Sequence, residues 1–207
     1  MAHVGKEETW ARLDIDTEKA SILVLERWKY NFIAGPGLPA WTAAEERQFH
    51  VRIVNQVSSI WNYKIRLSVS GLAPFAHRFK HAYLNFDIRR VTLGQHWTVN
   101  VRKMPKGSTP TSFISNVDRP VLSVNLDTAD FDSYTPVNAA GKSHKFQAVP
   151  HEFGHTFPGV DDEYVAGATN LADTDSIMNI GNRVRERHVK PILASLNTMI
   201  PNCVFTW

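Results

Sequence analysis

The pattern His151-Glu152-Phe153-Gly154-His155 is the part of the sequence whose residue types and spacing could do chemistry. On a helix, residues four positions apart lie on one face, so both imidazoles can point at the same ion. Neutral imidazole nitrogen is a zinc ligand, and a catalytic zinc site takes three protein ligands and leaves one position for water. Glu152 follows the first ligand directly, where a carboxylate can take a proton from an attacking water. The pattern therefore predicts a zinc site that supports hydrolysis.

The flanking residues predict the helix that presents this pattern. We expect a helix within residues 145–157, ended by the pair Pro158-Gly159. Pro150 directly precedes the first histidine, and because proline is tolerated only in the first turn, the helix should kink or start afresh there. The ligands lie downstream of this point, so either outcome preserves the site. Apolar residues at helical spacing predict a stripe that faces the core, formed by Phe146, Val149, Phe153 and Phe157.

The stretch HEFGHTFPGVDDEY, with SIMNIG at residues 176–181, resembles the metzincin-like zinc peptidases. Its HExxHxxxGxxDEY spacing is similar to that of IgA-peptidase-type metallopeptidases. The HEFGH, DEY and SIMNxG combination also resembles peptidase domains that bacterial contractile injection systems use as effectors. The resemblance covers about residues 144–190. It implies a zincin-like fold, a chain that turns back after the helix to offer a third ligand, and a turn that places Met178 beneath the metal.

The third ligand departs from the usual metzincin pattern. Gly159 lies four residues after His155 instead of three, and no histidine follows it at the expected distance. A carboxylate must therefore serve. Alignment on the glycine and on the acidic ending resembles small bacterial zinc peptidases whose third ligand is aspartate, which makes Asp162 the first choice and Asp161 the second. Glu163 would then point elsewhere.

Two residues near the C-terminus are rivals for this position. Glu186 and His188 lie on an expected terminal helix, and either could be the third ligand if the fold is closer to peptidases that take it from a second helix. His188 could also stabilise the oxyanion, or it could be one polar position on a solvated helix face. Spacing alone does not choose between these roles, because it does not fix the path of a loop.

Composition narrows the classes of protein. The single cysteine, Cys203, excludes an internal disulfide and a thiolate zinc cage, which leaves the nine histidines and the carboxylates as ligands. The net charge is +3, and the densest basic segment, residues 183–190, is short, carries Glu186 and has no aromatic residue, which argues against a nucleic-acid partner. The N-terminus has no apolar signal segment, and the longest apolar run, residues 22–25, is too short for a membrane span. We expect a soluble chain made in the cytoplasm without a Sec signal peptide, with export by a contractile injection or other specialised system left open.

The elements that must position the site follow from periodicity. Thr42 and Glu45 form a capping-box pattern before an amphipathic helix at residues 43–62. Strands are expected at residues 21–25 or 28–33, and period-two alternation predicts more at 63–69, 84–88 and 97–101, with another at 121–126. This order predicts a mixed α/β (α+β) domain at residues 21–207, with a twisted mixed sheet, a backing helix, an active-site helix and a C-terminal helix. Residues 1–20 are expected to be an irregular lead-in or export segment.

Together these observations predict a zinc-dependent metalloendopeptidase that acts on a protein or peptide substrate, with a secretion apparatus as a further partner if it is an exported toxin or effector. We expect zinc to be held by His151, His155 and Asp162, Glu152 to act as general base and acid, and either backbone groups or His188 to assist the oxyanion. The resemblance also implies that the strand at residues 121–126 forms the upper rim of the cleft and pairs with the substrate. The alternative is a non-catalytic module in which zinc stabilises a structural or binding domain.

Overall fold

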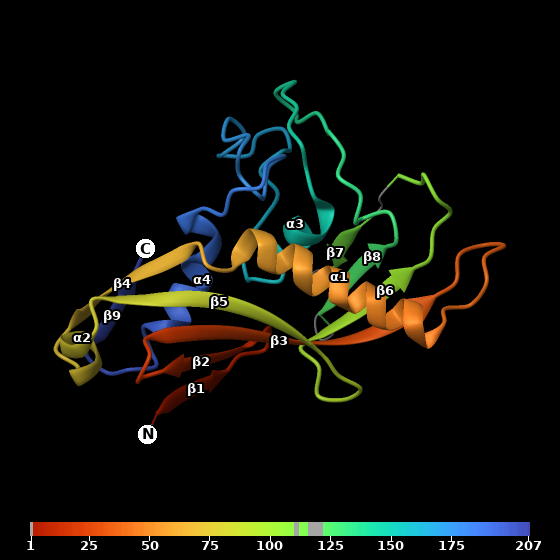
Figure 1. Cartoon of the computed structure of the whole chain (residues 1–207). Helices are drawn as coiled ribbons and strands as arrows, with labels where there is room; N and C mark the ends of the chain where they lie inside the picture. The colour runs from red at the N-terminus through yellow and green to blue at the C-terminus, as the bar shows by residue number, and fades with distance from the viewer. Residues whose placement is uncertain (1, 110–111, 116–121) are drawn as a thin grey trace.

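The computed structural model describes residues 2–109, 112–115 and 122–207 (Figure 1). These residues form one mixed sheet, with few helices, in an α+β arrangement. The elements in chain order are β1 (His3–Glu7), β2 (Arg12–Asp16), β3 (Ser21–Ile33), α1 (Ala43–Trp61), β4 (Ile65–Gly71), α2 (Pro74–Arg78), β5 (His81–Arg90), β6 (Trp97–Arg102), β7 (Phe113–Ser115), β8 (Ser123–Asp127), α3 (Ala148–Gly154), α4 (Glu186–Leu196) and β9 (Cys203–Thr206).

The sheet is organised around the long strand β3. Its strand order is β7-β8-β6-β3-β5-β4-β9, with β2 paired to the first half of β3 and β1 paired to β2. The pairs β3–β5, β3–β6 and β6–β8 are parallel, whereas β7–β8, β4–β5, β4–β9, β2–β3 and β1–β2 are antiparallel. Residues 21–28 of β3 pair with β5, and residues 28–33 pair with β6. One strand thus joins the two halves of the sheet.

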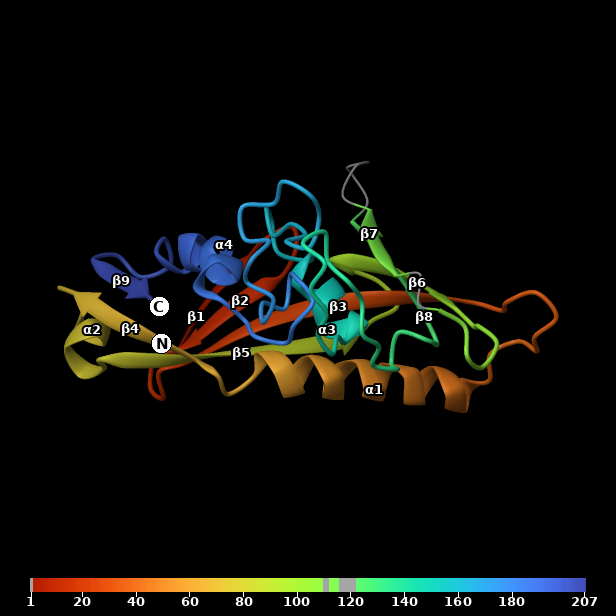
Figure 2. The same cartoon turned by 90° about the horizontal axis from the view of Figure 1, so that it is seen from above.

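The helix expected at residues 43–62 is confirmed as α1, which runs along one face of the sheet (Figure 2). The capping box is present, because the Thr42 side chain accepts from the Glu45 backbone while the Glu45 carboxylate accepts from the Thr42 backbone. The buried positions Phe49, Ile53 and Val57, with Trp61, form one apolar face. Burial of this face against β5 and α3 fixes α1 on the sheet.

The first two strand candidates are one continuous strand. β3 spans Ser21–Ile33 and contains both of the ranges that the sequence offered as alternatives. Glu26 lies inside this strand and is fully buried: Trp28 Nε1 donates to its Oε2 at 2.6 Å, and Thr156 Oγ1 lies 2.6 Å from its Oε1. A buried carboxyl group inside the sheet was not expected from the sequence.

The expectation of an irregular lead-in at residues 1–20 is wrong for the described part of that segment. β1 and β2 form an antiparallel pair that extends the sheet from β3. Leu13 and Ile15 are completely buried, while Arg12 and Asp14 at alternate positions contact Glu7 and His3 of β1 across the strands. The alternation was hidden because only two apolar residues mark the inner face of a five-residue strand.

The strand expected at residues 121–126 corresponds to β8, whose described residues begin at Ser123; Val121 lies outside the described residues. The terminal helix is confirmed as α4, and its burial pattern includes His188 and Val189. Three further elements, α2, β7 and β9, were not expected from the sequence. Among the described residues, no helix combines the length and the apolar character that a bilayer crossing requires.

Candidate metal centre

The short helix α3 carries the two histidines. It begins at Ala148, so Pro150 lies in the first turn, where its missing N–H costs nothing. The helix ends at Gly154, earlier than the Pro158-Gly159 pair had indicated. His155 is nevertheless its C-cap with helical backbone angles (φ −69°, ψ −11°), which preserves the four-residue spacing. The two imidazole rings lie 4.8 Å apart, centroid to centroid.

The opposite face of this segment is fixed in the core. All four members of the expected apolar stripe are buried. The Phe153 ring packs edge-on against Trp61 at 5.5 Å, and the Trp61 indole donates to the carbonyl of Pro150 at 3.0 Å. Beneath the helix, Met178 is fully buried, and a Cβ on Gly154 would lie 2.4 Å from its sulfur. Only glycine allows this contact, so α3 and the 176–181 turn are held at a fixed separation.

Three ligand atoms converge above α3. His151 Nε2 and His155 Nε2 are 3.2 Å apart, and Asp162 Oδ1 lies 3.0 Å from each of them. His151 is almost completely buried, whereas the carboxylate of Asp162 is one-third exposed. The structure thus brings together the two histidines and the first-choice aspartate as a candidate metal triad.

Backbone carbonyls orient both imidazoles. His151 Nδ1 lies 2.7 Å from the carbonyl oxygen of Ile177, and His155 Nδ1 lies 2.8 Å from that of Val160. A carbonyl can only accept, so Nδ1 carries the proton and donates in each ring. Each Nε2 of a neutral ring then presents a lone pair to the carboxylate oxygen. Hydrogen bonds of this kind fix the tautomer of metal-binding histidines.

Three acceptors at this separation require a cation or a proton between them. Burial alone would raise the pKa of Asp162, yet its contacts with His151 and His155 hold the pKa well below the usual range. Burial lowers the pKa of His155, but Asp162 and Glu152 outweigh it and leave the pKa raised. Ligands held about 2.0–2.2 Å from a tetrahedral ion lie roughly 3.3–3.6 Å apart. The observed separations of 3.0–3.2 Å are slightly shorter than these values but close to them. The two nitrogens and one oxygen therefore fit one face of such a coordination sphere.

Glu152 lies beside the triad and does not belong to it. Its Oε2 is buried and has no hydrogen-bond partner among the described residues. Burial raises the pKa of its carboxyl, against the opposing effect of His151 and His155. An unpartnered buried carboxylate oxygen is costly, which suggests that it is kept for a substrate, a water or a proton.

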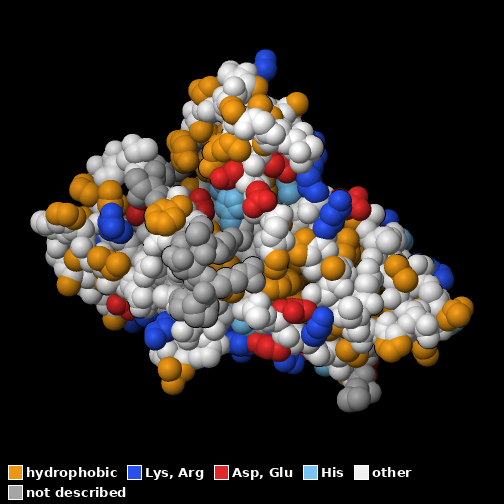
Figure 3. Space-filling view, turned by 180° about the vertical axis from the view of Figure 1, so that it is seen from behind, with side chains coloured by type: hydrophobic (Ala, Val, Ile, Leu, Met, Phe, Trp, Pro, Cys, Tyr) orange, Lys and Arg blue, Asp and Glu red, His pale blue; other side chains and the backbone are white. Residues whose placement is uncertain are grey.

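Two hollows meet at Glu152. One, of about 380 Å³, is lined by Phe113 and Ile114 of β7 and by His155 and Asp162. The other, of about 210 Å³, lies on the side of His151 and has a mixed lining that includes Phe146, Tyr164 and Asn179. The space-filling view from behind shows histidine and acidic side chains gathered in a hollow of the surface (Figure 3). Glu152 therefore contributes to the wall of both hollows.

The other candidates for the third ligand lie outside the triad. Asp161 is exposed and lines the larger hollow, and Glu186 is exposed at the first residue of α4. His188 is buried, but its Nδ1 accepts from the Arg185 backbone at 3.1 Å, and its Nε2 faces Glu163 Oε1 at 3.3 Å. Both ring nitrogens thus contact the segment between α3 and α4, and the expected role of His188 at the oxyanion stays a prediction.

Sequence reasoning missed the residues that hold this loop. Glu163 points away from the triad, as expected, but its partner Arg187 was not anticipated. Thr156 also ties the site to the sheet through its contact with Glu26. The run of arginines at residues 183–187 was the available signal, since clustered cations before a helix need acidic partners.

The fold and the site together define a mixed α/β protein with a His-His-Asp candidate metal triad at a surface hollow. Comparisons with models of protein families, with curated proteins and with solved structures find no match for this chain.

Proposed function

We propose that the protein is a zinc-dependent metalloendopeptidase. The observation that carries the proposal is the convergence of two imidazole nitrogens and one carboxylate oxygen within 3.0–3.2 Å, next to a buried glutamate oxygen that has no partner among the described residues. Two nitrogens and one oxygen suit zinc, and three ligands beside a hollow leave room for a substrate. A purely structural zinc site would instead be closed by a fourth protein ligand.

His151, His155 and Asp162 would hold the metal, and the carbonyls of Ile177 and Val160 would fix the tautomer and the orientation of the two imidazoles. When bound, zinc supplies Lewis acidity that polarises a substrate carbonyl and lowers the pKa of water. The chain itself provides the proton transfer. Glu152, buried between the two hollows, takes a proton from the attacking water and delivers it to the leaving amine nitrogen.

The substrate-binding edge differs from the one that the motif resemblance implied. β8 lies between β6 and β7, so its residues 123–125 are already paired on both sides. β7 is the outer strand among the described residues, and Phe113 and Ile114 line the larger hollow next to His155. An extended peptide that adds to β7 would bring its main chain past Glu152, a mode in which backbone hydrogen bonds supply affinity.

The test is the isosteric substitution Glu152→Gln, with Glu186→Gln, at an exposed position of α4, as the matched control. Zinc-loaded wild type and Glu186→Gln should cleave a mixture of unstructured peptides equally. Glu152→Gln should bind the same amount of zinc and lose at least about 100-fold in rate, because proton transfer by a positioned group contributes on the order of 10²–10⁴. Mass spectrometry of the products measures the cleavage rate, and metal analysis of the proteins measures the bound zinc.

A Glu152→Gln protein that cleaves at the wild-type rate would refute the assigned mechanism. If wild-type protein binds one zinc tightly and cleaves nothing, the non-catalytic zinc-stabilised module is the better description. If it binds no zinc, the metal site itself is refuted.

A further inference from the structure

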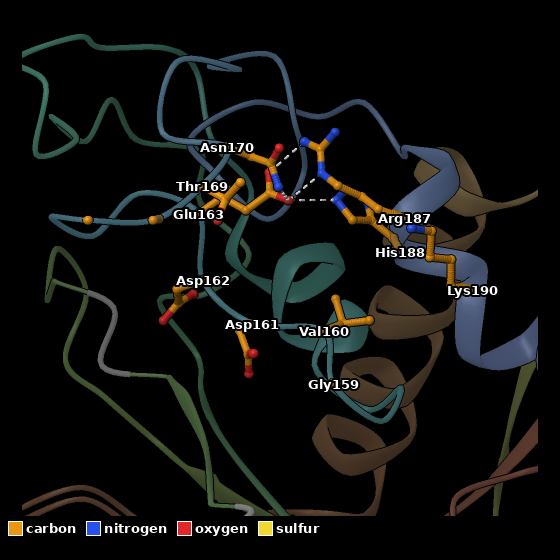
Figure 4. Close-up of a pocket in the computed structure, with 12 residues that line it drawn as sticks. Gly159, Val160, Asp161, Asp162, Glu163, Thr169, Asn170, Arg187, His188 and Lys190 are labelled. Atoms are coloured by element: carbon orange, nitrogen blue, oxygen red, sulfur yellow. Dashed lines mark hydrogen bonds and ion pairs between the residues drawn. The ribbon is translucent and has the colours of Figure 1, made fainter.

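A cluster of charged side chains lies directly behind the third ligand. Glu163 follows Asp162 in the chain, and its carboxylate receives both arms of Arg187: Nε donates to Oε1 at 2.5 Å and Nη2 donates to Oε2 at 2.7 Å. Two parallel hydrogen bonds from one guanidinium fix the orientation of a carboxylate as well as its position. Figure 4 shows Glu163 directed toward Arg187 and His188, while Asp162 points the other way.

The cluster extends into a second ion pair. Arg187 Nη2 also donates to Asp173 Oδ2 at 2.7 Å, and Asp173 receives Arg185 Nε at 2.9 Å and Arg185 Nη2 at 2.6 Å. Two arginines at the start of α4 therefore hold two acids of the preceding loop. Only Arg187 contacts the acid that adjoins the metal triad, whereas the contacts of Arg185 with these acids go to Asp173 alone.

Side chains hold the loop that carries Asp162: Glu163 is bonded by Arg187 at 2.5 and 2.7 Å and, at longer distances, contacted by His188 at 3.3 Å and Asn170 at 3.4 Å. α3 ends at Gly154 and α4 begins at Glu186, with no helix or strand between them, so no repeating backbone pattern sets the path. The Glu163 N–H donates to the carbonyl of Met178 at 2.7 Å, which ties the same residue to the turn beneath α3. The Glu163 side chain is only 9% exposed, so water competes little for its bonds. These contacts fix Glu163, and Asp162 is the residue directly before it in the chain.

We propose that Arg187 is a positioning residue for the third ligand: by clamping Glu163, it holds Asp162 at the distance from His151 and His155 that a metal requires. The inference rests on the proposed metal site, and it concerns how this chain builds that site. Lysine would keep the positive charge but lose the planar guanidinium that donates two parallel hydrogen bonds, so it cannot replace arginine at a bidentate contact. Groups that orient metal ligands from behind typically contribute about 10–100-fold to metal affinity.

The experiment compares zinc affinity, measured by competition with a chromophoric chelator, in wild type, Arg187→Lys, Arg187→Met and Arg185→Lys. Both Arg187 variants should bind zinc about 10–100-fold more weakly, and Arg185→Lys should stay within about threefold of wild type. The melting temperature of each metal-free protein is the control for folding, since both arginines support the same cluster. If Arg187→Met does not fold, the zinc affinity of Arg187→Lys still tests the proposal.

A second readout separates positioning from general loosening. Cobalt(II) replaces zinc, and its visible absorption depends on the ligand set. The spectrum of cobalt-loaded Arg187→Met should shift toward that of Asp162→Ala, whereas Arg185→Lys should keep the wild-type spectrum.

The outcomes are distinguishable. Unchanged zinc affinity in Arg187→Lys, or an equal loss in Arg185→Lys, would overturn the inference while leaving the peptidase proposal intact. A protein that binds zinc in an Arg187-dependent way and hydrolyses nothing would refute the peptidase and keep the inference. Wild type that binds no zinc would overturn both.

Discussion

The sheet with α1 and the segment from Thr128 to Arg185 are held together by different forces. In the sheet, long paired strands and a 19-residue helix bury continuous apolar faces, with β3 paired to β5, β6 and β2. The second segment contains one seven-residue helix, α3, and is otherwise made of turns and bends. Outside the apolar stripe around α3, polar side chains make many of its contacts. Asn138, for example, accepts from two backbone N–H groups and donates to the Leu171 carbonyl and to Asn179.

This difference matters because the candidate site lies in the second segment. Regular hydrogen bonding gives the sheet rigidity without help from particular side chains. The loop beside α3 depends instead on individual contacts, so a single substitution can move a ligand. The site gains its position from the few places where the loop is bound to the sheet, chiefly Phe153 and Thr156.

The contact that joins the two regions should show the largest effect. Phe153 is completely buried against Trp61 and Phe86, and Phe153→Ala should lower the free energy of unfolding by about 3–5 kcal/mol through lost burial and a cavity. Urea unfolding measures the change. Phe113→Ala, at a ring that is 56% exposed on β7, is the control and should change stability little.

If the loss in Phe153→Ala is below about 1 kcal/mol, the ring does not connect the two regions as described. Hydrogen exchange then shows whether residues 128–185 open without the sheet.

The second effect is a pH dependence at Glu26. Burial raises its pKa to about 8 from a usual value of 4.5, with Thr156 and Trp28 opposing the shift. Thr156 Oγ1 also lies 2.6 Å from the Phe153 carbonyl, so its one proton satisfies that acceptor only if Glu26 donates its own proton to Thr156. The folded state therefore binds this proton more tightly than the unfolded state.

The free energy of unfolding should then fall as the pH rises from about 4.5 to about 8, and level off above. Glu26→Gln keeps a donor for Thr156 and an acceptor for Trp28 but has no charge. Between about pH 5 and about pH 7, wild type should lose on the order of 2 kcal/mol more than Glu26→Gln. Glu18→Gln, at an exposed position, should follow the wild-type curve. Parallel curves for wild type and Glu26→Gln would contradict a neutral buried acid.

The smallest effect belongs to the far end of α1. Thr42→Ala removes the cap on the Glu45 backbone and should cost about 1 kcal/mol in unfolding free energy, without a change in zinc affinity. Thr9→Ala, at an exposed threonine outside any helix, is the control. A zinc affinity that fell with Thr42→Ala would show that the two regions are coupled more widely than through Phe153 and Thr156.

The regular elements could be predicted where periodicity was long. The 43–62 helix, its capping box and the strands of the middle third follow from spacing, because one buried face imposes a repeat. The same logic failed where the pattern was short or interrupted. β1 and β2 carry too few apolar residues to reveal an inner face, and neither of the two ranges offered for the first strand covers the whole of β3.

The sequence by itself determined the donor types and the pairing of His151 with His155, because four-residue spacing on a helix is a local property. Only the tertiary structure chose Asp162 over Asp161, Glu186 and His188. The loop after α3 has no periodicity, and its path depends on contacts with residues far along the chain, among them Met178 and Arg187. Such contacts form only when the whole chain is folded, so spacing could propose the ligand but not place it.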